Sequence, residues 1–195
     1  MNLSDIFEGM IRDISPCLQR ISQREVDDAV DEIVSARSVF VAGMGRSGYM
    51  MRAFAMRLMQ LGINTYMVGD TSTPSAGDGD LLIIGSGSGE TANLKNYMAK
   101  AKALNVRTLV LTSHGDSTLG RAADRKVVID IAEASRKTAD GSVIVQASEN
   151  KGDHLLFGSL GETCMLLCTE AIVMAVFKRI GATETDMMRR HAVFE

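Results

Sequence analysis

Short apolar runs alternate with longer amphipathic segments through the middle of the chain. Val39–Ala42 is continuously apolar, as a strand buried on both faces should be. The expected strands are 39–42, 64–68, 80–84, 107–111 and 127–131, and the expected helices between them are 47–61, 92–104 and 118–123. Strands that alternate with helices predict βαβ units. The predicted fold class is therefore α/β, a three-layer α/β/α sandwich around a five-stranded parallel sheet of the flavodoxin or Rossmann-like kind.

Helical patterns flank this core on both sides. Residues 2–36 read as helical with a break near Pro16, and Ser22 to Glu25 have the sequence of a capping box that opens a second helix. The segment 159–180 is apolar almost all round, which predicts a helix buried in the core or against another subunit. Residues 183–186, Thr-Glu-Thr-Asp, can cap a last short helix.

The remaining segment, residues 132–156, is polar and predicts an exposed loop. We interpret the whole chain as one domain, because 195 residues suit a single hydrophobic core. Its parts are N-terminal helices over 1–37, the α/β core over 38–131 and C-terminal helices over 158–195.

Composition and charge narrow the classes of function. The net charge is −3 and the basic residues are scattered, whereas a nucleic-acid surface needs clustered cations. The apolar run 171–177 is too short to cross a bilayer, and the acidic N-terminus lacks the pattern of a secretory signal. Cys17, Cys164 and Cys168 form no cluster with zinc-ligand spacing. We expect a cytoplasmic protein with reduced thiols, no metal, and neither a nucleic-acid nor a membrane partner.

A glycine-rich turn follows the first expected strand. Gly43 to Gly48 has the spacing G-x-G-x-x-G between a strand and a helix, where backbone N–H groups and the helix dipole favour an anion. The same spacing is the fingerprint of dinucleotide sites, and Asp70 stands where a ribose-binding acid is possible. This turn alone leaves two interpretations open, a nicotinamide-dependent dehydrogenase or a site for another phosphate.

A second glycine-rich turn follows the third expected strand and favours the second interpretation. Gly85 to Thr91 reads Gly-Ser-Gly-Ser-Gly-Glu-Thr and offers three hydroxyls within six residues. A terminal phosphate has three oxygens that each need several donors, and Ser86, Ser88 and Thr91 beside a helix N-terminus can supply them. The alternative is that these hydroxyls only cap the next helix, although a cap needs only one of them.

These motifs together resemble the sugar isomerase (SIS) domain. The resemblance rests on strand–GxGRSG–helix, strand–SGSGET–helix and a buried helix opened by Gly-Ser-x-x-Glu, over roughly residues 38–195. The run GRSGYMMRAFAMRLMQLGINTYMVGDTSTPS and the ending MMRRHAVFE are similar to the 6-phospho-3-hexuloisomerase family within that class. The resemblance implies a phosphosugar substrate, no cofactor, and assembly as a homodimer or homotetramer.

The resemblance also implies a reaction. Arabino-3-hexulose 6-phosphate and fructose 6-phosphate interconvert when a base removes the proton at C2, a cis-enediolate forms, and the proton returns at C3. Glu162 matches the glutamate that the family uses for proton transfer. A competing interpretation is that Ser159 to Glu162 forms a capping box, which would tie the carboxylate to the backbone.

Other candidate residues divide into a second proton carrier and a binding set. His191 is the candidate second proton carrier, in its own or a neighbouring subunit's site, since an imidazole can move a proton between substrate oxygens near neutral pH. Its alternative is a solvated tail histidine, and His114 and His154 receive no role. Arg46 can polarise a sugar oxygen or offset phosphate charge. The expected substrate- and phosphate-binding set is Gly45, Arg46, Ser47, Ser86, Gly87, Ser88 and Thr91.

The sequence departs from the family pattern just before the glutamate helix. The segment 132–161 is longer and more polar than usual, and Gly161 stands where an aromatic residue normally precedes Glu162. Two alternatives to the hexulose reaction therefore stay open. One is an isomerase of a related phosphosugar, and the other is a non-catalytic SIS protein that senses a sugar phosphate.

Overall fold

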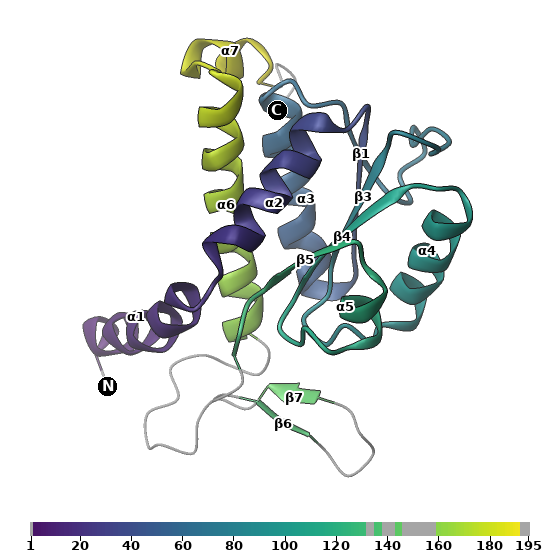
Figure 1. The fold of residues 1–195 in the computed structure, drawn as a ribbon. Helices are drawn as coiled ribbons and strands as arrows, with labels where there is room; N and C mark the ends of the chain where they lie inside the picture. Colours follow the sequence, from purple (N-terminus) through teal and green to yellow (C-terminus); the bar gives the residue numbers. More distant parts are fainter. Residues whose placement is uncertain (1, 132–134, 138–142, 146–158, 192–195) are drawn as a thin grey trace.

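A five-stranded parallel sheet forms the centre of the molecule (Figure 1). The computed structural model describes residues 2–131, 135–137, 143–145 and 159–191. The strand order is β2-β1-β3-β4-β5, and all four neighbouring pairs run parallel. The strands are β1 (Val39–Gly43), β2 (Thr65–Met67), β3 (Leu81–Gly85), β4 (Arg107–Thr112) and β5 (Arg125–Val128).

Helices cover both faces of this sheet, as the alternating pattern predicts. One face packs against α1 (Leu3–Gln19), α2 (Gln23–Ser35), α3 (Gly45–Gln60) and α6 (Ser159–Ile180), and the other against α4 (Ala92–Ala103) and α5 (Thr118–Ala122). In β1, Val39 and Val41 point into the first layer of helices, whereas Phe40 and Ala42 point toward α4. This alternation confirms the three-layer α/β/α sandwich.

The N-terminal helices differ from the expectation in two details. Pro16 lies inside α1, and the chain leaves the helix only after Gln19. Ser22 does cap α2, because its hydroxyl accepts from the Glu25 backbone N–H at 3.4 Å. The other bond of the predicted capping box, from the Ser22 backbone N–H to the Glu25 carboxylate, was wrongly predicted. The Glu25 carboxylate instead accepts from the Val128 N–H at 2.8 Å and so ties α2 to β5.

Two boundaries and one segment expected to be a loop also differ from the sequence prediction. The fifth strand is β5 at 125–128 rather than 127–131, and α3 begins at Gly45 rather than at 47. The segment 132–156 was expected to be a loop, but β6 (Ser135–Lys137) and β7 (Val143–Val145) pair antiparallel within it. The rest of that segment lies outside the described residues.

The long helix α6 is held in the first layer of helices. It packs against α3, α2 and α1, and both Cys164 and Cys168 on it are buried. By length and composition alone, α6 is long and apolar enough to cross a membrane. The sequence prediction considered only the shorter apolar run 171–177 within this helix. Half of its most apolar window is buried against these helices, as in a core helix. After α6 comes α7 (Glu184–Arg189), which Thr183 caps as expected, in a reciprocal capping box with Asp186.

Candidate functional site

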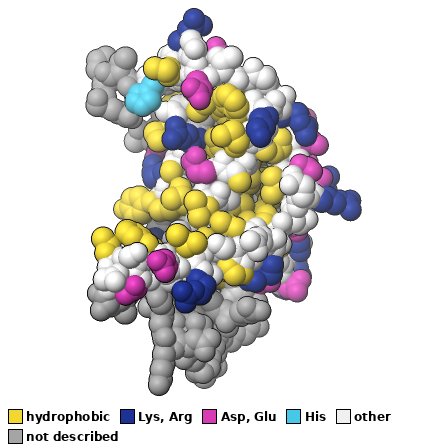
Figure 2. Space-filling model, turned by 90° about the vertical axis from the view of Figure 1, so that its left-hand side faces the viewer, with side chains coloured by type: hydrophobic (Ala, Val, Ile, Leu, Met, Phe, Trp, Pro, Cys, Tyr) yellow, Lys and Arg dark blue, Asp and Glu magenta, His cyan; other side chains and the backbone are white. Residues whose placement is uncertain are grey.

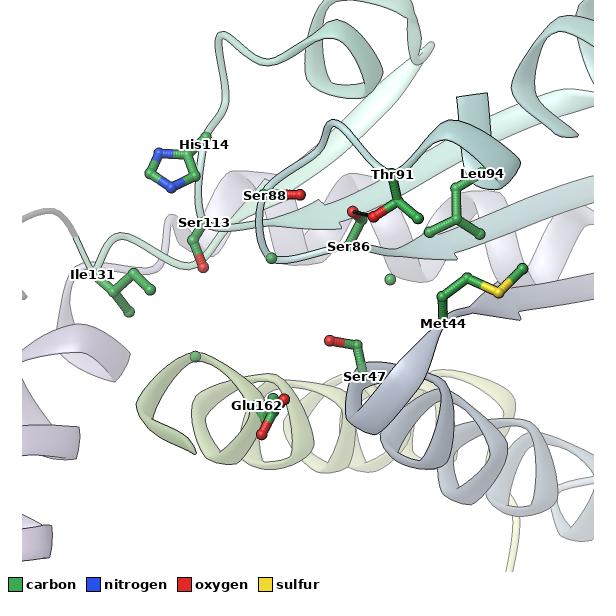
Figure 3. Close-up of a pocket in the computed structure, with 13 residues that line it drawn as sticks. Met44, Ser47, Ser86, Ser88, Thr91, Leu94, Ser113, His114, Ile131 and Glu162 are labelled. Atoms are coloured by element: carbon green, nitrogen blue, oxygen red, sulfur yellow. Dashed lines mark hydrogen bonds between the residues drawn. The ribbon is translucent and has the colours of Figure 1, made fainter. Parts of the chain in front are cut away.

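The candidate site lies at the carboxyl ends of β1 and β3. From this point the chain winds outward in opposite directions, toward β2 on one side and toward β4 and β5 on the other. Open α/β sheets bind ligands at such a reversal of strand order. A pocket of about 210 Å³ occupies the position, as Figure 3 shows. Its lining residues are Met44, Ser47, Gly85, Ser86, Gly87, Ser88, Thr91, Leu94, Ser113, His114, Ile131, Gly161 and Glu162.

The first glycine turn shapes one side of the pocket. Met44 and Ser47 line the cavity, whereas Gly45 and Arg46 are not among the lining residues. Gly48 packs so closely on β1 that an added Cβ would lie 2.9 Å from the Gly43 carbonyl oxygen. The spacing that resembles a dinucleotide fingerprint thus lets α3 pack directly against the end of the strand.

The second glycine turn forms the opposite side, with three hydroxyls that bond within the loop. The buried Ser86 accepts from the Gly89 N–H at 3.2 Å and lies 3.3 Å from the Thr91 hydroxyl. Ser88 accepts from the Glu90 N–H at 3.2 Å. Gly89 has φ +65°, and a Cβ there would lie 1.9 Å from the Ser117 hydroxyl. These contacts fix the loop with Ser86, Ser88 and Thr91 turned to one cavity (Figure 3).

The interpretation of these hydroxyls as simple helix caps does not fit the geometry. Thr91 is the N-cap residue of α4, yet its side chain makes no cap bond. Met44, the N-cap residue of α3, makes none either. Two helix N-termini therefore meet the pocket without a side-chain cap, and N–H groups in that state favour an anion.

Glu162 enters the pocket from the first turn of α6, opposite the second glycine turn, residues 85–91, which we call the serine loop (Figure 3). Its carboxylate forms an ion pair with the Arg46 guanidinium of α3. The Glu162 side chain is 17% exposed, whereas that of Arg46 is 63% exposed. Ser159 is the first residue of α6 rather than the residue before it. The carboxylate therefore reaches across to α3, which argues against the capping-box interpretation.

Sequence reasoning missed two polar residues of the pocket wall, Ser113 and His114, and gave His114 no role. They follow β4, whose carboxyl end lies next to that of β3. The Ser113 N–H donates to the Gly87 carbonyl at 3.0 Å, which locks this turn to the serine loop. The adjacency of β3 and β4 was the available signal, because parallel strands end at the same edge of a sheet.

A second and larger cavity, of about 600 Å³, adjoins the pocket and shares Ser88, Ser113 and His114 with it. Its wall carries more charge than that of the first. The pKa of Glu90 is lowered to about 2, because the backbone N–H and the hydroxyl of Thr118 both donate to its carboxylate. The remaining lining residues are Glu90, Gly115, Asp116, Ser117, Arg121, Val128 and Asp130.

His191 lies far from the pocket of its own chain. It follows α7, which sits at the end of α6 remote from β5 and α5 (Figure 1). Glu162 and Ile180 are separated by about 27 Å along α6, at 1.5 Å per residue. The structure therefore does not bring His191 and Glu162 together within one chain. His154 lies outside the described residues.

Comparison with known proteins supports the interpretation of the motifs. The SIS domain family model matches residues 32–148. A Bacillus subtilis protein called 3-hexulose-6-phosphate isomerase is 35% identical over the whole of both chains. A Mycobacterium gastri protein of the same name is 34% identical over 96% of this chain and 89% of its own.

A solved structure is also similar. It comes from Methanococcus jannaschii, and a 3-hexulose-6-phosphate isomerase function has been inferred for it. The two chains are 27% identical and superpose with a TM-score of 0.75 over 99% of this chain and 98% of the other. The chain described here belongs to the SIS domain family, together with the full-length relatives that are called 3-hexulose-6-phosphate isomerases.

Proposed function

We propose that the protein is a sugar-phosphate isomerase that interconverts arabino-3-hexulose 6-phosphate and fructose 6-phosphate. The observation that carries this proposal is one pocket with an anion-binding loop on one wall and the carboxylate of Glu162 on the other. The names of the full-length relatives support this choice of substrate. The loop binds the phosphate, which does not react, and thereby holds the C2–C3 unit against Glu162.

In the proposed mechanism Glu162 moves the carbon-bound proton. It removes the proton from C2, and the electron pair of that C–H bond forms the C2–C3 double bond of an enediolate. The same carboxylic acid then returns the proton to C3, while the hydroxyl proton at O2 moves to O3. Arg46 holds the Glu162 carboxylate from the side of α3 and offers a positive charge near the developing oxyanion.

The experiment that tests this function uses NMR on the purified protein with fructose 6-phosphate in D₂O. An isomerase exchanges the proton at a sugar carbon for deuterium and produces the 3-hexulose. A panel of other ketose and aldose phosphates identifies the preferred substrate. Binding of fructose 6-phosphate without exchange or isomer formation, for every sugar in the panel, would show a sensor instead of an enzyme.

We also propose that the protein works as a homodimer or homotetramer. Hydrophobic side chains gather over the face that carries α1 and α6 (Figure 2). On α1, Leu3, Phe7 and Ile11 recur every four residues and are each more than half exposed. On α6, Leu167 and Met174 are exposed on one side of the helix. Large contiguous apolar surfaces mark protein interfaces, and a second copy of the chain supplies a matching one. We propose in addition that the protein is located in the cytoplasm.

Such an assembly gives His191 a route to the reaction, because only another copy can bring it to the pocket. Neither E162Q nor H191Q alone is expected to be fully active. Subunits of the two variants are then mixed and reassembled. If each site combines Glu162 of one copy with His191 of the other, random pairing in a dimer should restore about a quarter of wild-type activity, because about half of the dimers are mixed and each has one complete site. Sedimentation of the mixture checks that the subunits assemble. No recovery in reassembled oligomers would leave His191 outside the site.

A further inference from the structure

The pocket must bind a phosphate dianion, yet none of the described residues that line it is Lys or Arg. Arg46 is paired with Glu162 on the other wall. Only two lining side chains titrate, Glu162 and His114, and only the imidazole can become positive. His114 is therefore the one described lining side chain that can supply a compensating cation.

The position of His114 is set by the loop that carries the hydroxyls. Its backbone N–H donates to the Thr112 hydroxyl at 3.2 Å, and its carbonyl accepts from the Ser117 N–H at 3.0 Å. The Thr112 hydroxyl in turn donates to the Gly87 carbonyl at 3.2 Å. Ser88 shares both cavities with His114 (Figure 3). His114 thus follows Ser113 on a backbone that is bonded to the loop of Ser86 and Ser88, and its ring lies at the edge of the pocket, on the side away from Thr91 (Figure 3).

The second cavity, which the same imidazole lines, carries three carboxylates and one guanidinium in its wall. Carboxylates close to His114 favour its protonated form. Glu90 is an anion throughout the neutral pH range, because Thr118 holds its pKa at about 2. Two of these carboxylates are ion-paired, Glu90 with Lys95 of α4 at 3.2 Å and Asp130 with Arg20 at 3.4 Å. The other charged groups nearby are Asp116 and Arg121 near α5, Lys126 of β5, and the Glu162–Arg46 pair of α6 and α3.

We propose that His114 is a pH-dependent cation that binds the substrate's phosphate from the junction of the two cavities, so that substrate binding takes up a proton. This inference rests on the proposed phosphate site and deepens it. A dianion next to the imidazole raises the pKa of His114 in the complex above its value in the free protein. The affinity is therefore highest at low pH and falls as the pH rises through the free and then the bound pKa.

The expected size follows if the protein with a protonated imidazole binds the dianion about tenfold more tightly than the protein with a neutral imidazole. Wild-type protein then takes up roughly half a proton more per site at pH 7 than H114Q does. Its affinity advantage over H114Q shrinks about sevenfold between pH 6 and pH 8.5. The ionisation of the ligand itself cancels, because both proteins bind the same fructose 6-phosphate.

The test is isothermal titration calorimetry of fructose 6-phosphate in two buffers of different ionisation enthalpy, at pH 6, 7 and 8.5. The lysine of H114K keeps its positive charge throughout this pH range. Apart from the ionisation of the ligand itself, H114K should therefore bind fructose 6-phosphate as tightly at pH 8.5 as at pH 6. It should not take up the additional proton that the wild type takes up. Thermal unfolding confirms that each variant is folded.

The outcomes separate this inference from the proposed function. Equal proton uptake by wild type and H114Q, with normal binding by both, overturns the role of His114 and leaves the phosphate site standing. No binding of fructose 6-phosphate to the wild type overturns both. Binding with the predicted proton uptake but no isomerisation keeps the role of His114 and removes only the reaction.

Discussion

Replacement of Glu162 by glutamine is expected to lower kcat about 10²- to 10⁴-fold, which is the usual contribution of general acid–base catalysis. The amide keeps the shape of the side chain but cannot accept the carbon-bound proton, which is at C3 when fructose 6-phosphate is the substrate. The phosphate loop on the opposite wall is untouched, so KM should change little. Steady-state kinetics with fructose 6-phosphate measures both constants. Exchange of the sugar proton in D₂O measures the proton transfer directly, and it should fall with kcat.

Glu170 provides a matched control on the same helix. It lies two turns beyond Glu162 on α6, pairs with Arg57 at 3.8 Å and is 44% exposed. The variant E170Q removes the same charge from α6 and should retain wild-type kinetics. Turnover by E162Q at the wild-type rate, with the deuterium exchange intact, would remove Glu162 from the reaction. In that case its pairing with Arg46 would be structural.

The sequence was sufficient to predict the sheet, because each strand carries its own signal. Val39–Ala42 and Leu81–Ile84 are apolar on both faces, and this is the pattern of a parallel strand between two layers of helices. The two glycine turns could also be recognised from the sequence, because each is a local motif. Their residues are contiguous in the sequence, so the loop and the helix N-terminus that bind an anion are specified together.

Features that depend on contacts between distant segments were harder to predict. Arg46 and Glu162 are 116 residues apart and meet only because α3 and α6 pack side by side. Glu25 was expected to close its own capping box, but a strand N–H 103 residues away takes its carboxylate. A local sequence motif predicts one hydrogen-bond partner for a side chain. In the folded protein, a donor from a distant segment can lie closer and bond to that side chain instead.

His114 shows the same limit within the site. Nothing local distinguishes it from a solvated loop histidine, since Gly115 and Asp116 follow it as in an ordinary turn. It becomes a pocket residue because β4 lies beside β3, and that adjacency follows from the strand order. His191 is the opposite case. Its sequence context suggested a site residue, while the fold places it at the far end of α6.

Removal of the Ser88 and Thr91 hydroxyls together is expected to raise KM by more than about 10²-fold, since each hydrogen bond to a charged group contributes about 1.5–3 kcal/mol. Both residues line the pocket, and the Ser88 hydroxyl accepts from the Glu90 N–H of its own loop at 3.2 Å. The phosphate does not change during the reaction, so its contacts stabilise substrate and transition state alike. The constant kcat should therefore fall much less than KM rises. Inhibition by inorganic phosphate should weaken in parallel with KM, which identifies the lost contact as one to the phosphate.

Ser86 and Ser35 separate binding from folding in this experiment. Ser86 is only 3% exposed and holds the Gly89 N–H, so S86A should also lower the free energy of unfolding. Ser35 lies at the end of α2, where its hydroxyl bonds to the Glu32 carbonyl at 3.3 Å, and S35A should leave KM unchanged. If the double variant S88A/T91A keeps both the wild-type KM and the wild-type inhibition by phosphate, the substrate's anion binds elsewhere. The carboxylate of Glu162 would then face no anchored sugar, and the proposed arrangement of loop and base would fail with it.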